Sequence, residues 1–396
     1  MTYTVNEEKI LVRELKLTSL LSYGLQAEPI PLRGLNVIIG PNGSGKSNLI
    51  EAIALLRAAP SDLGTIIRRG GGTREWIWKG DANGVAEVEA VVSSPVGSQP
   101  LRHALSFRAE EQGFRLADER IENEQRTDPN KPDPIFYYRY QKGHPVINVA
   151  GQKRELVRES VEPDLSILAQ RRDPETYPEL SYLASSYEKI RIYREWAFGR
   201  NSIFREPQKA DMRNDRLEED FSNLGLFLNR LRRNSKTKKA ILTALGDLYD
   251  GLNDFYETIE GGTVQVFFTE GDYSIPATRL SDGTLRYLCL LAILCDPDPP
   301  PLICIEEPEL GLHPDILPKV ADLLVSASMR TQLIITTHSD ILVDAMTERP
   351  EAILICEKHE GQTTMQRLES ETLKGWLAEY RLGELWTRGE LGGTRW

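Results

Sequence analysis

The sequence feature that most constrains the fold is a glycine-rich loop near the N-terminus, which reads G-P-N-G-S-G-K-S over residues 40–47. It fits the phosphate-loop pattern of two glycines five positions apart, followed by Lys and then Ser. Glycine lets several backbone N–H groups converge on phosphate oxygens, because it adopts backbone angles that other residues avoid. We expect Lys46 to place a positive charge on the β- and γ-phosphates and Ser47 to offer its hydroxyl to Mg²⁺.

The residues around this loop fit a strand before it and a helix after it. Residues 37–39 form an apolar run typical of a buried strand, and residues 48–56, NLIEAIALL, have the character of a helix. The N-terminal dipole of that helix favours anions. The alternative, a glycine-rich turn with no ligand, does not explain this strand–loop–helix context. We therefore expect these residues to bind ATP: Gly40, Pro41, Asn42, Gly43, Ser44, Gly45, Lys46, Ser47 and Asn48.

Length and composition favour a globular protein of more than one domain. The 396 residues, 40% hydrophobic and 27% charged, are enough to bury a sizeable core. The net charge of −11 argues against a uniformly basic surface that coats nucleic acid, but permits a local basic patch. No apolar run is long enough to span a bilayer, and the N-terminus lacks the form of a signal peptide. Because the four cysteines show no C-x-x-C spacing, we expect reduced, buried thiols in a cytoplasmic protein.

Two carboxylates follow a second predicted core strand. Residues 302–305 are apolar, and Glu306 and Glu307 come directly after them. Such a strand places acids at the carboxyl edge of a sheet, where open α/β folds bind their ligands. We expect Glu306 to hold the Mg²⁺ shell through water, and Glu307 to position and polarise the attacking water as catalytic base.

A third predicted strand, residues 333–337, ends at His338. At this edge the imidazole would hydrogen-bond the γ-phosphate, whereas a histidine taken alone more often has a structural role. Its place after the other motifs favours the functional interpretation. The candidate catalytic residues are therefore Lys46, Glu307 and His338.

The pentapeptide L-S-D-G-T, residues 280–284, precedes an apolar helix. By itself it is consistent with an ordinary capped helix start. Its position between the glycine-rich loop and the acidic strand makes it informative.

The middle of the chain, residues 96–261, carries no such motif. Strands are predicted over residues 84–91, 101–108, 135–140 and 145–149. Two apolar stripes with helical 4-3-4-3 spacing predict an antiparallel helical hairpin at about residues 215–258: Leu217, Phe221, Leu224, Leu228 and Leu231, then Ile241, Leu245, Leu248, Leu252 and Phe255. Between them residues 230–239 contain six basic and no acidic residues. This tip would contact DNA phosphates through Arg232, Arg233, Lys236, Lys238 and Lys239, or else form an ordinary solvated face.

Two further residues have open alternatives. Tyr23 would stack on adenine, or it would pack against the body of the protein. Gln170 is a candidate for the glutamine that senses Mg²⁺ and the γ-phosphate in related ATPases, although its flanking sequence is not distinctive.

The order of motifs, G-x4-G-K-S, L-S-D-G-T, I-E-E-P-E and T-T-H-S, resembles the ATP-binding-cassette (ABC) class of P-loop ATPases. Within that class the chain looks like the RecF/SMC-type heads of DNA repair, chromosome maintenance and anti-phage defence. The sequences GPNGSGKSN and IEEPELGLHP are similar to the compact bacterial "predicted ATPase" branch (AAA family ATPases) related to overcoming-lysogenisation-defect ATPases. The resemblance covers roughly residues 1–95 and 262–356.

The resemblance implies an α/β fold, namely an ABC/SMC-type head with a mixed sheet flanked by helices and an inserted β-rich and helical-hairpin region. The expected division is an N-terminal part of the head over 1–95, the insert over 96–261 and the C-terminal part over 262–396. ATP and Mg²⁺ are the implied cofactors, with Glu306 and Ser47 at the metal. Ser281, Asp282 and Gly283 match the signature that contacts ATP held by a second protomer, so a homodimer is implied. Asp282 departs from the family pattern, where glycine is commonest.

The expected function is an ATP-driven dimerisation switch that acts on DNA or on a partner nuclease, in DNA repair or anti-phage defence. The insert of about 166 residues is too short for SMC-type arms, and the roughly 58 residues after His338 leave little room for a nuclease domain. A nuclease would therefore be a separate partner. One alternative is the nucleotide-binding subunit of an ABC transporter. The two motif sequences and the large insert argue against it. A scaffold that does not hydrolyse ATP is another, against which Glu307 stands.

Overall fold

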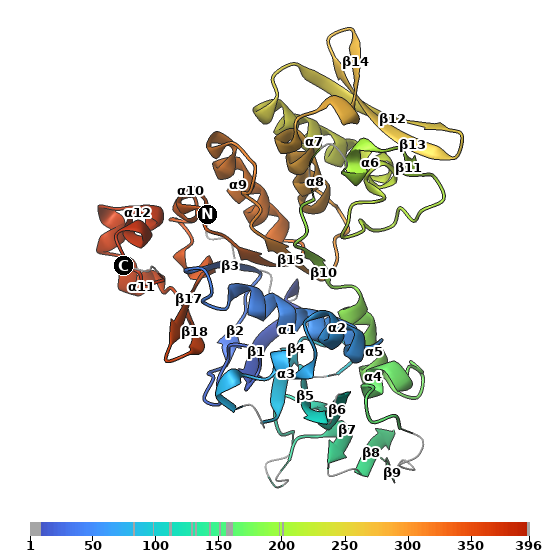
Figure 1. Cartoon of the computed structure of the whole chain (residues 1–396), viewed down its shortest axis with the longest axis vertical. Helices are drawn as coiled ribbons and strands as arrows, with labels where there is room; N and C mark the ends of the chain where they lie inside the picture. The colour runs from blue at the N-terminus through green and yellow to red at the C-terminus, as the bar shows by residue number, and fades with distance from the viewer. Residues whose placement is uncertain are drawn as a thin grey trace.

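The computed structural model describes most of the chain, with short gaps. The described residues are 9–81, 84–97, 99–110, 113–127, 130, 133–141, 144–149, 152–155, 161–197, 199 and 202–393. They form two lobes that meet at a central, mostly parallel sheet (Figure 1).

The central sheet has six strands in the order β10-β15-β16-β3-β17-β18. The strands are β10 (Arg191–Tyr193), β15 (Leu302–Glu306), β16 (Gln332–Thr336), β3 (Leu35–Ile39), β17 (Ile353–His359) and β18 (Gln362–Arg367). The first five are parallel, and β18 runs antiparallel to β17. The three strands that the sequence predicts before the glycine-rich loop, the two acids and His338 are therefore adjacent. Their carboxyl ends meet at one edge.

Alternate residues of these strands face two different cores. On β3, Val37 and Ile39 pack toward helices α8 (Asp282–Leu294) and α9 (Leu317–Ser328), whereas Ile38 packs toward helix α1 (Lys46–Ala58). Both faces are covered, which explains why these strands are continuously apolar.

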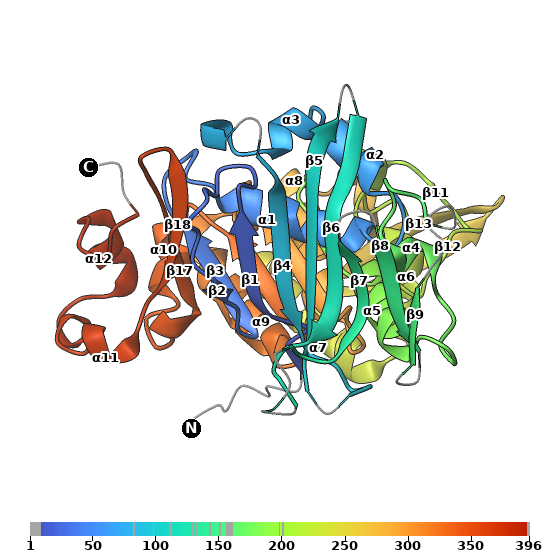
Figure 2. The ribbon, with the colours of Figure 1, turned by 90° about the horizontal axis from the view of Figure 1, so that it is seen from below.

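An eight-stranded antiparallel sheet in the order β2-β1-β4-β5-β6-β7-β8-β9 packs against α1 and lies in front of it in Figure 2. Its strands are β1 (Val12–Thr18), β2 (Ile30–Pro31), β4 (Ala86–Val92), β5 (Leu101–Glu110), β6 (Gly113–Asn123), β7 (Phe136–Gln141), β8 (His144–Val149) and β9 (Gln152–Glu155). The four strands predicted between residues 84 and 149 are present as β4, β5, β7 and β8. The sheet joins strands from both sides of residue 95, so the β-rich region extends the head.

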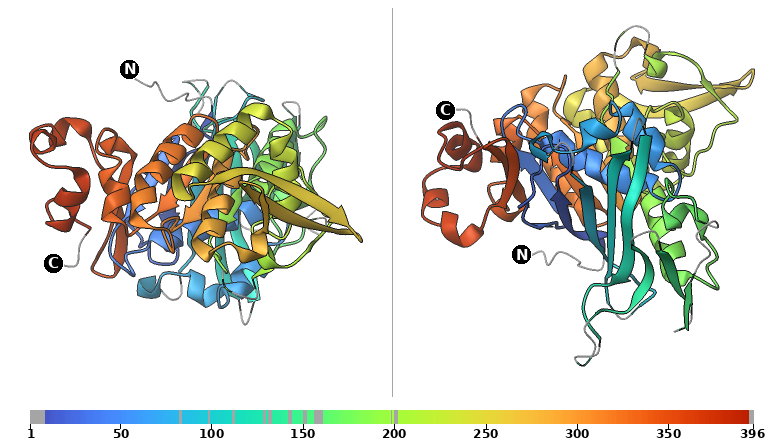
Figure 3. Two further views of the ribbon diagram at one scale, coloured as in Figure 1. Left: turned by 90° about the horizontal axis from the view of Figure 1, so that it is seen from above. Right: turned by 60° about the horizontal axis from the view of Figure 1, so that its bottom comes forward.

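The other lobe combines helices with a small sheet. It contains α6 (Leu224–Arg232), α7 (Ser235–Leu248), β11 (Gln208–Lys209), β12 (Leu252–Glu260), β13 (Thr263–Glu270) and β14 (Tyr273–Pro276). The helices pack on α8 and on β12, while the β12–β13 hairpin projects from the lobe (Figure 3).

The predicted helical hairpin over about 215–258 is wrong in its extent. The first helix begins only at Leu224, because Phe221 has a φ of 60°, which interrupts a right-handed helix. The second helix ends at Leu248, and Leu252 and Phe255 belong to a strand. An irregularity in strand register between Leu252 and Asp254 turns both apolar side chains inward, which imitates helical spacing.

The remaining helices are short: α2 (Leu63–Arg69), α3 (Thr73–Trp76), α4 (Ile167–Gln170), α5 (Pro178–Glu188), α10 (Asp340–Asp344), α11 (Ser370–Leu373) and α12 (Leu382–Thr387). Within the described ranges, no helix combines the length and the hydrophobicity needed to cross a bilayer. All four cysteines are unpaired, and three of them are fully buried.

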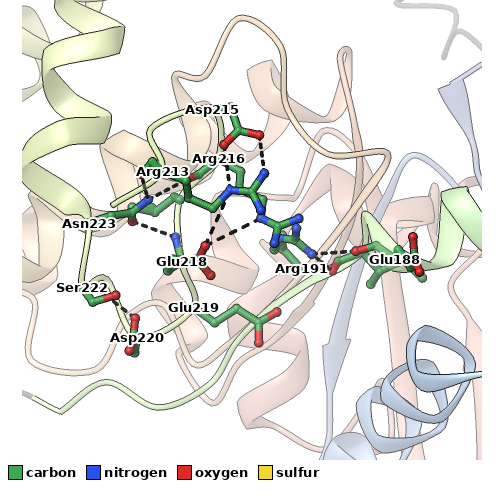
Figure 4. A network of polar contacts seen from close by, with 12 residues as sticks. Glu188, Arg191, Arg213, Asp215, Arg216, Glu218, Glu219, Asp220, Ser222 and Asn223 are labelled. Atoms are coloured by element: carbon green, nitrogen blue, oxygen red, sulfur yellow. Dashed lines mark hydrogen bonds and ion pairs between the residues drawn. The ribbon is translucent and has the colours of Figure 1, made fainter. Parts of the chain in front are cut away.

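Residues 211–223 carry a network of polar contacts, which includes Arg213, Asp215 and Asn223 (Figure 4). Glu219 accepts a hydrogen bond of 2.8 Å from the backbone N–H of Ile192, and it also pairs with Arg57 on α1. Asn223 fixes the segment by donating to the carbonyl oxygens of Arg213 and Arg216. One backbone N–H of the edge strand β10 thereby has a side-chain partner.

One buried side chain joins the two large sheets. The side-chain amide of Gln332 on β16 accepts a hydrogen bond from the N–H of Val12 (2.9 Å) and donates one to the C=O of Val12 (2.7 Å). It therefore satisfies both backbone polar groups of this residue on β1. Gln332 and Val12 are both 0% exposed. Without the amide, two buried backbone groups would lose their partner.

We expect Gln332→Leu to lower the free energy of unfolding by about 2–4 kcal/mol, because it strands these two buried groups. Urea unfolding followed by circular dichroism measures the change. Gln366→Leu, at an exposed position on β18, is the matched control and should change the free energy by less than about 0.5 kcal/mol. Equal effects of the two variants would contradict the bridging role of Gln332.

Candidate functional site: a nucleotide cradle beside two carboxylates

The glycine-rich loop follows a backbone path that only glycine adopts easily. Gly40, Gly43 and Gly45 have φ values of 151°, 79° and 114°. A Cβ at Gly40 would lie 2.1 Å from the carbonyl oxygen of Cys356, and one at Gly45 would lie 2.2 Å from the Thr363 hydroxyl. Both backbone angle and close packing therefore require glycine, which supports the predicted phosphate loop.

Residues from distant parts of the chain support the loop from behind. The Thr363 hydroxyl on β18 donates to the carbonyl oxygen of Ser44 at 2.6 Å. It also shares a hydrogen bond of 2.6 Å with the hydroxyl of Ser22, which accepts from the side chain of Asn48 at 2.7 Å. Asn48 thus holds the loop in shape. The sequence analysis missed Ser22 and Thr363, because isolated hydroxyl residues far from the motif carry no recognisable signal.

Lys46 begins α1 and is only 7% exposed. Its ammonium group donates to the carbonyl oxygens of Gly40 (2.8 Å) and Pro41 (3.0 Å). Burial lowers the pKa of Lys46, while the charges of Glu306 and Glu307 oppose that shift. The buried cation therefore faces the space that the loop encloses, where a phosphate group would compensate its charge.

The end of β15 brings Glu306 to the start of α1. Burial raises the pKa of the Glu306 carboxyl group, whereas the charge of Arg194 and a contact with the Ser47 hydroxyl lower it. Among the described residues, its Oε1 atom is buried without a hydrogen-bond partner. A hydroxyl and a carboxylate with one unsatisfied oxygen suit Mg²⁺, which prefers oxygen ligands. Ser47 and Glu306 would hold the ion.

Glu307 and His338 face each other across neighbouring strands. The Glu307 carboxylate lies 3.6 Å from His338 Nε2, within ion-pair distance but beyond the range of a hydrogen bond. Burial and the nearby charge of Lys46 lower the pKa of His338, while the charge of Glu307 opposes the shift, and the net effect favours the neutral imidazole. The backbone of Glu307 has a φ of 46°, an uncommon conformation for a residue other than glycine.

Two side chains that the sequence analysis missed fix the backbone of the acids. Arg286 on α8 donates to the Glu307 carbonyl oxygen at 3.0 Å, and the indole N–H of Trp196 donates to the Glu306 carbonyl oxygen at 2.8 Å. The Arg286 guanidinium lies 4.4 Å from the centre of the Trp196 ring, a cation–π contact. The signature helix and the segment after β10 thus both touch the acidic strand end.

Gln170 does not lie at this site. Its side chain is engaged locally, accepting from Glu162 N–H (2.9 Å) and donating to Leu165 C=O (2.8 Å). Instead β10, the strand next to β15, delivers Arg194 and Trp196 to the carboxyl edge. Gln170 is therefore wrong as the sensor residue, because its helix belongs to the lobe of the antiparallel sheet.

Tyr23 packs against the protein body. It is 2% exposed, and its hydroxyl lies 3.4 Å from the carbonyl oxygen of Gly45. A buried ring is not available to stack on adenine. Of the two alternatives, the packing role is the one that the structure supports.

The signature residues line a separate cleft of about 840 Å³. Ser281 caps α8 by accepting from the N–H of Thr284 at 3.1 Å. A Cβ at Gly283 would lie 3.0 Å from the Gly311 carbonyl oxygen, so this position packs tightly on the loop after the acids. Arg279 and Gly311 also line the cleft, whose described lining includes none of residues 40–48. One chain therefore does not bring the signature onto its own phosphate loop.

The basic run 230–239 is partly neutralised. Lys238 pairs with Asp254 at 2.7 Å, and Arg232 lies 3.6 Å from Glu257. Arg230 pairs with Asp296. Arg233, Lys236 and Lys239 remain solvent-exposed. The charge available to a polyanion is thus smaller than the sequence indicates.

We expect Thr363→Val to weaken ATP binding by about fivefold to thirtyfold, since it removes a buried hydrogen bond that shapes the loop. Titration with a fluorescent ATP analogue measures the affinity. Thr364→Val, at the neighbouring exposed position of β18, is the control and should bind as the parent does. Equal affinity of both variants would mean that the loop holds its shape without Thr363.

Comparisons with known proteins agree with this geometry. The family described as "AAA domain, putative AbiEii toxin, Type IV TA system" matches residues 35–344. Among solved structures, an Smc head bound to the C-winged helix domain of ScpA is 17% identical, with a TM-score of 0.54 over 91% of this chain and 99% of that chain. An Smc head with an extended coiled coil, derived from Pyrococcus furiosus and bound to the C-terminal domain of ScpA, is 14% identical, with a TM-score of 0.56 over 93% and 99%.

At these identities the solved structures show the fold alone, and they confirm the expected ABC/SMC-type head. None of the curated proteins matches at a significant level. The family match extends over more than half of the sequence and includes the phosphate loop, the signature, the acidic strand and His338. The chain therefore belongs to this AAA-domain family and is a P-loop ATPase of the SMC/AAA type.

Proposed function

We propose that this protein is a Mg²⁺-dependent ATPase that dimerises around ATP and works as a switch. The observation that carries the proposal is the separation of two half-sites in one chain. Lys46, Ser47 and Glu306 gather at the phosphate loop, whereas Ser281 and Gly283 line a different cleft. A two-fold dimer would bring each phosphate loop against the signature of the other chain.

Each residue then has a role that its surroundings support. Lys46 binds the β- and γ-phosphates, and Ser47 and Glu306 hold Mg²⁺, which neutralises phosphate charge when bound. Glu307 accepts the proton of the attacking water, because its carboxylate lies at the strand end beside Lys46. Neutral His338 donates one hydrogen bond to the γ-phosphate. The first-turn N–H groups of α8, at Asp282 and Gly283, contact the partner chain's nucleotide.

The target of the switch is DNA or a separate effector nuclease, in DNA repair or anti-phage defence. The family description names a toxin of a type IV toxin–antitoxin system, and the Smc heads were solved with ScpA domains. Both descriptions are consistent with an ATPase whose nucleotide-bound state controls another macromolecule. These likenesses favour the switch over the transporter subunit.

Mixing two inactive variants tests the dimer. We expect Lys46→Ala and Ser281→Arg to be inactive alone, since each damages one half of both sites. In a mixed dimer one site carries both lesions and the other carries none. Equal mixing makes half of the dimers mixed, so about a quarter of parental ATPase activity should return if the sites act independently. Steady-state phosphate release after subunit exchange measures this recovery.

Two controls make this result decisive. Lys46→Ala mixed with itself must stay inactive, and exchange of chains must be confirmed with differently tagged protein. Activity that never rises above the two single variants, despite exchange, would contradict independent composite sites. A strictly monomeric parent with full activity would reject the ATP-bridged dimer.

The basic run allows a separate test of DNA as the target. We expect Arg233→Glu/Lys236→Glu/Lys239→Glu to weaken DNA binding and to reduce the magnitude of its salt dependence, because these exposed cations are free to meet phosphates. Arg232→Glu/Lys238→Glu is the comparison, since these two cations already face Asp254 and Glu257. Fluorescence anisotropy at several salt concentrations gives both quantities. Unchanged affinity in the triple variant would make the run a solvated face.

A further inference from the structure

The signature carries a carboxylate at the place where the proposed function requires an anion to bind. Asp282 is the first residue of the 13-residue helix α8, directly after the N-cap Ser281. Its carboxylate favours the helix, because negative charge at an N-terminus interacts well with the helix dipole. The same carboxylate opposes a phosphate group at that helix end. A signature with a free aspartate is therefore poorly suited to receive the partner chain's nucleotide.

Arg205 meets this carboxylate directly. Its Nη2 atom lies 2.6 Å from Asp282 Oδ1, and the two form an ion pair. Arg205 is the more enclosed partner, with a side chain 17% exposed against 50% for Asp282. In this ion pair the positive charge of Arg205 compensates the negative charge of Asp282, so the start of the helix carries no net side-chain charge.

The rest of the Arg205 guanidinium is fixed by backbone oxygens. Nη1 donates to the carbonyl oxygen of Thr278 at 2.5 Å, just before the signature, and Nε donates to that of Gly199 at 3.1 Å. The arginine is thus held on both sides of its ion pair. It does not depend on Asp282 for its position.

The segment that carries Arg205 also reaches the acids. Trp196, nine residues earlier, donates to the Glu306 carbonyl oxygen, and its ring stacks under Arg286 of α8. Trp196 therefore contacts the end of the acidic strand, and Arg205 contacts the signature.

We propose that Arg205 is a positioning residue for the signature half of the ATP site: it neutralises Asp282 so that the start of α8 accepts the γ-phosphate of ATP bound to the partner chain. The proposal rests on the proposed ATP-bridged dimer. It assigns a function to Arg205, namely to compensate the negative charge of Asp282 at the start of α8.

The test uses the full chain carrying Glu307→Gln, in which hydrolysis is expected to stop and the ATP-bound dimer to accumulate. Sedimentation velocity with Mg²⁺ and ATP gives the dimer dissociation constant. Arg205→Ala is expected to raise this constant by about tenfold or more, because two uncompensated carboxylates then face phosphate groups. Adding Asp282→Asn should restore it to within about threefold of the parent, since the repelling charge is gone.

Further variants separate charge from anchoring. Arg205→Lys keeps the charge and should dimerise better than Arg205→Ala. Arg213→Ala is the matched control, because Arg213 makes a similar ion pair with Asp215 away from the signature. It should dimerise as the parent does. ATP titration at a protein concentration where the chains are monomeric should give the parental ATP affinity for Arg205→Ala. The defect of this variant would then lie in dimerisation and not in nucleotide binding.

The outcomes distinguish this inference from the proposed function. If Arg205→Ala/Asp282→Asn stays as weak as Arg205→Ala, the arginine acts only as an anchor for Thr278 and Gly199, and the inference is overturned. A dimer constant that Arg205→Ala leaves unchanged also overturns it, while the ATP-bridged dimer stands. If the Glu307→Gln parent itself does not dimerise with ATP, the dimer and the inference fall together.

Discussion

The rest of the structure depends on one packing constraint, the contact of the phosphate loop with strands β17 and β18. Gly40 lies against the backbone of Cys356 on β17, and Gly45 lies against Thr363 on β18. Neither contact leaves room for a side chain. The loop is therefore shaped by residues more than 300 positions away in the sequence, and α1 takes its direction from that loop.

Burial gives the candidate site its electrostatic character. It lowers the pKa values of Lys46 and His338 and raises that of Glu306, so each group is shifted toward its neutral form. Groups of opposite charge restrain these shifts, as Arg194 does at Glu306. Phosphate and Mg²⁺ are the complementary charges that such a site would gain most from binding.

The sequence predicts the parts of this site that are local. An apolar strand followed by glycines, by two acids or by histidine is a short pattern, and the sheet brings all three patterns to one edge. It does not predict the residues that act across the fold, since Thr363 and Trp196 stand in segments without a motif, and Arg286 follows the signature but is not part of its pattern. The helical hairpin failed for another reason. A register irregularity between Leu252 and Asp254 in β12 turns both Leu252 and Phe255 inward, so that a strand shows the spacing of a helix.

The position of β3 in the middle of the sheet has a consequence for how the protein is made. β3 pairs with β16 on one side and with β17 on the other, so both of its neighbours are synthesised roughly 300 residues later. Contacts of such long separation form slowly, because the chain between them must first be closed into a loop. During synthesis on the ribosome, β3 therefore cannot pair with β16 and β17 until the last quarter of the chain has been translated. The glycine-rich loop gains its contact with Thr363 only after that residue has been translated, so the candidate nucleotide site is completed late in synthesis.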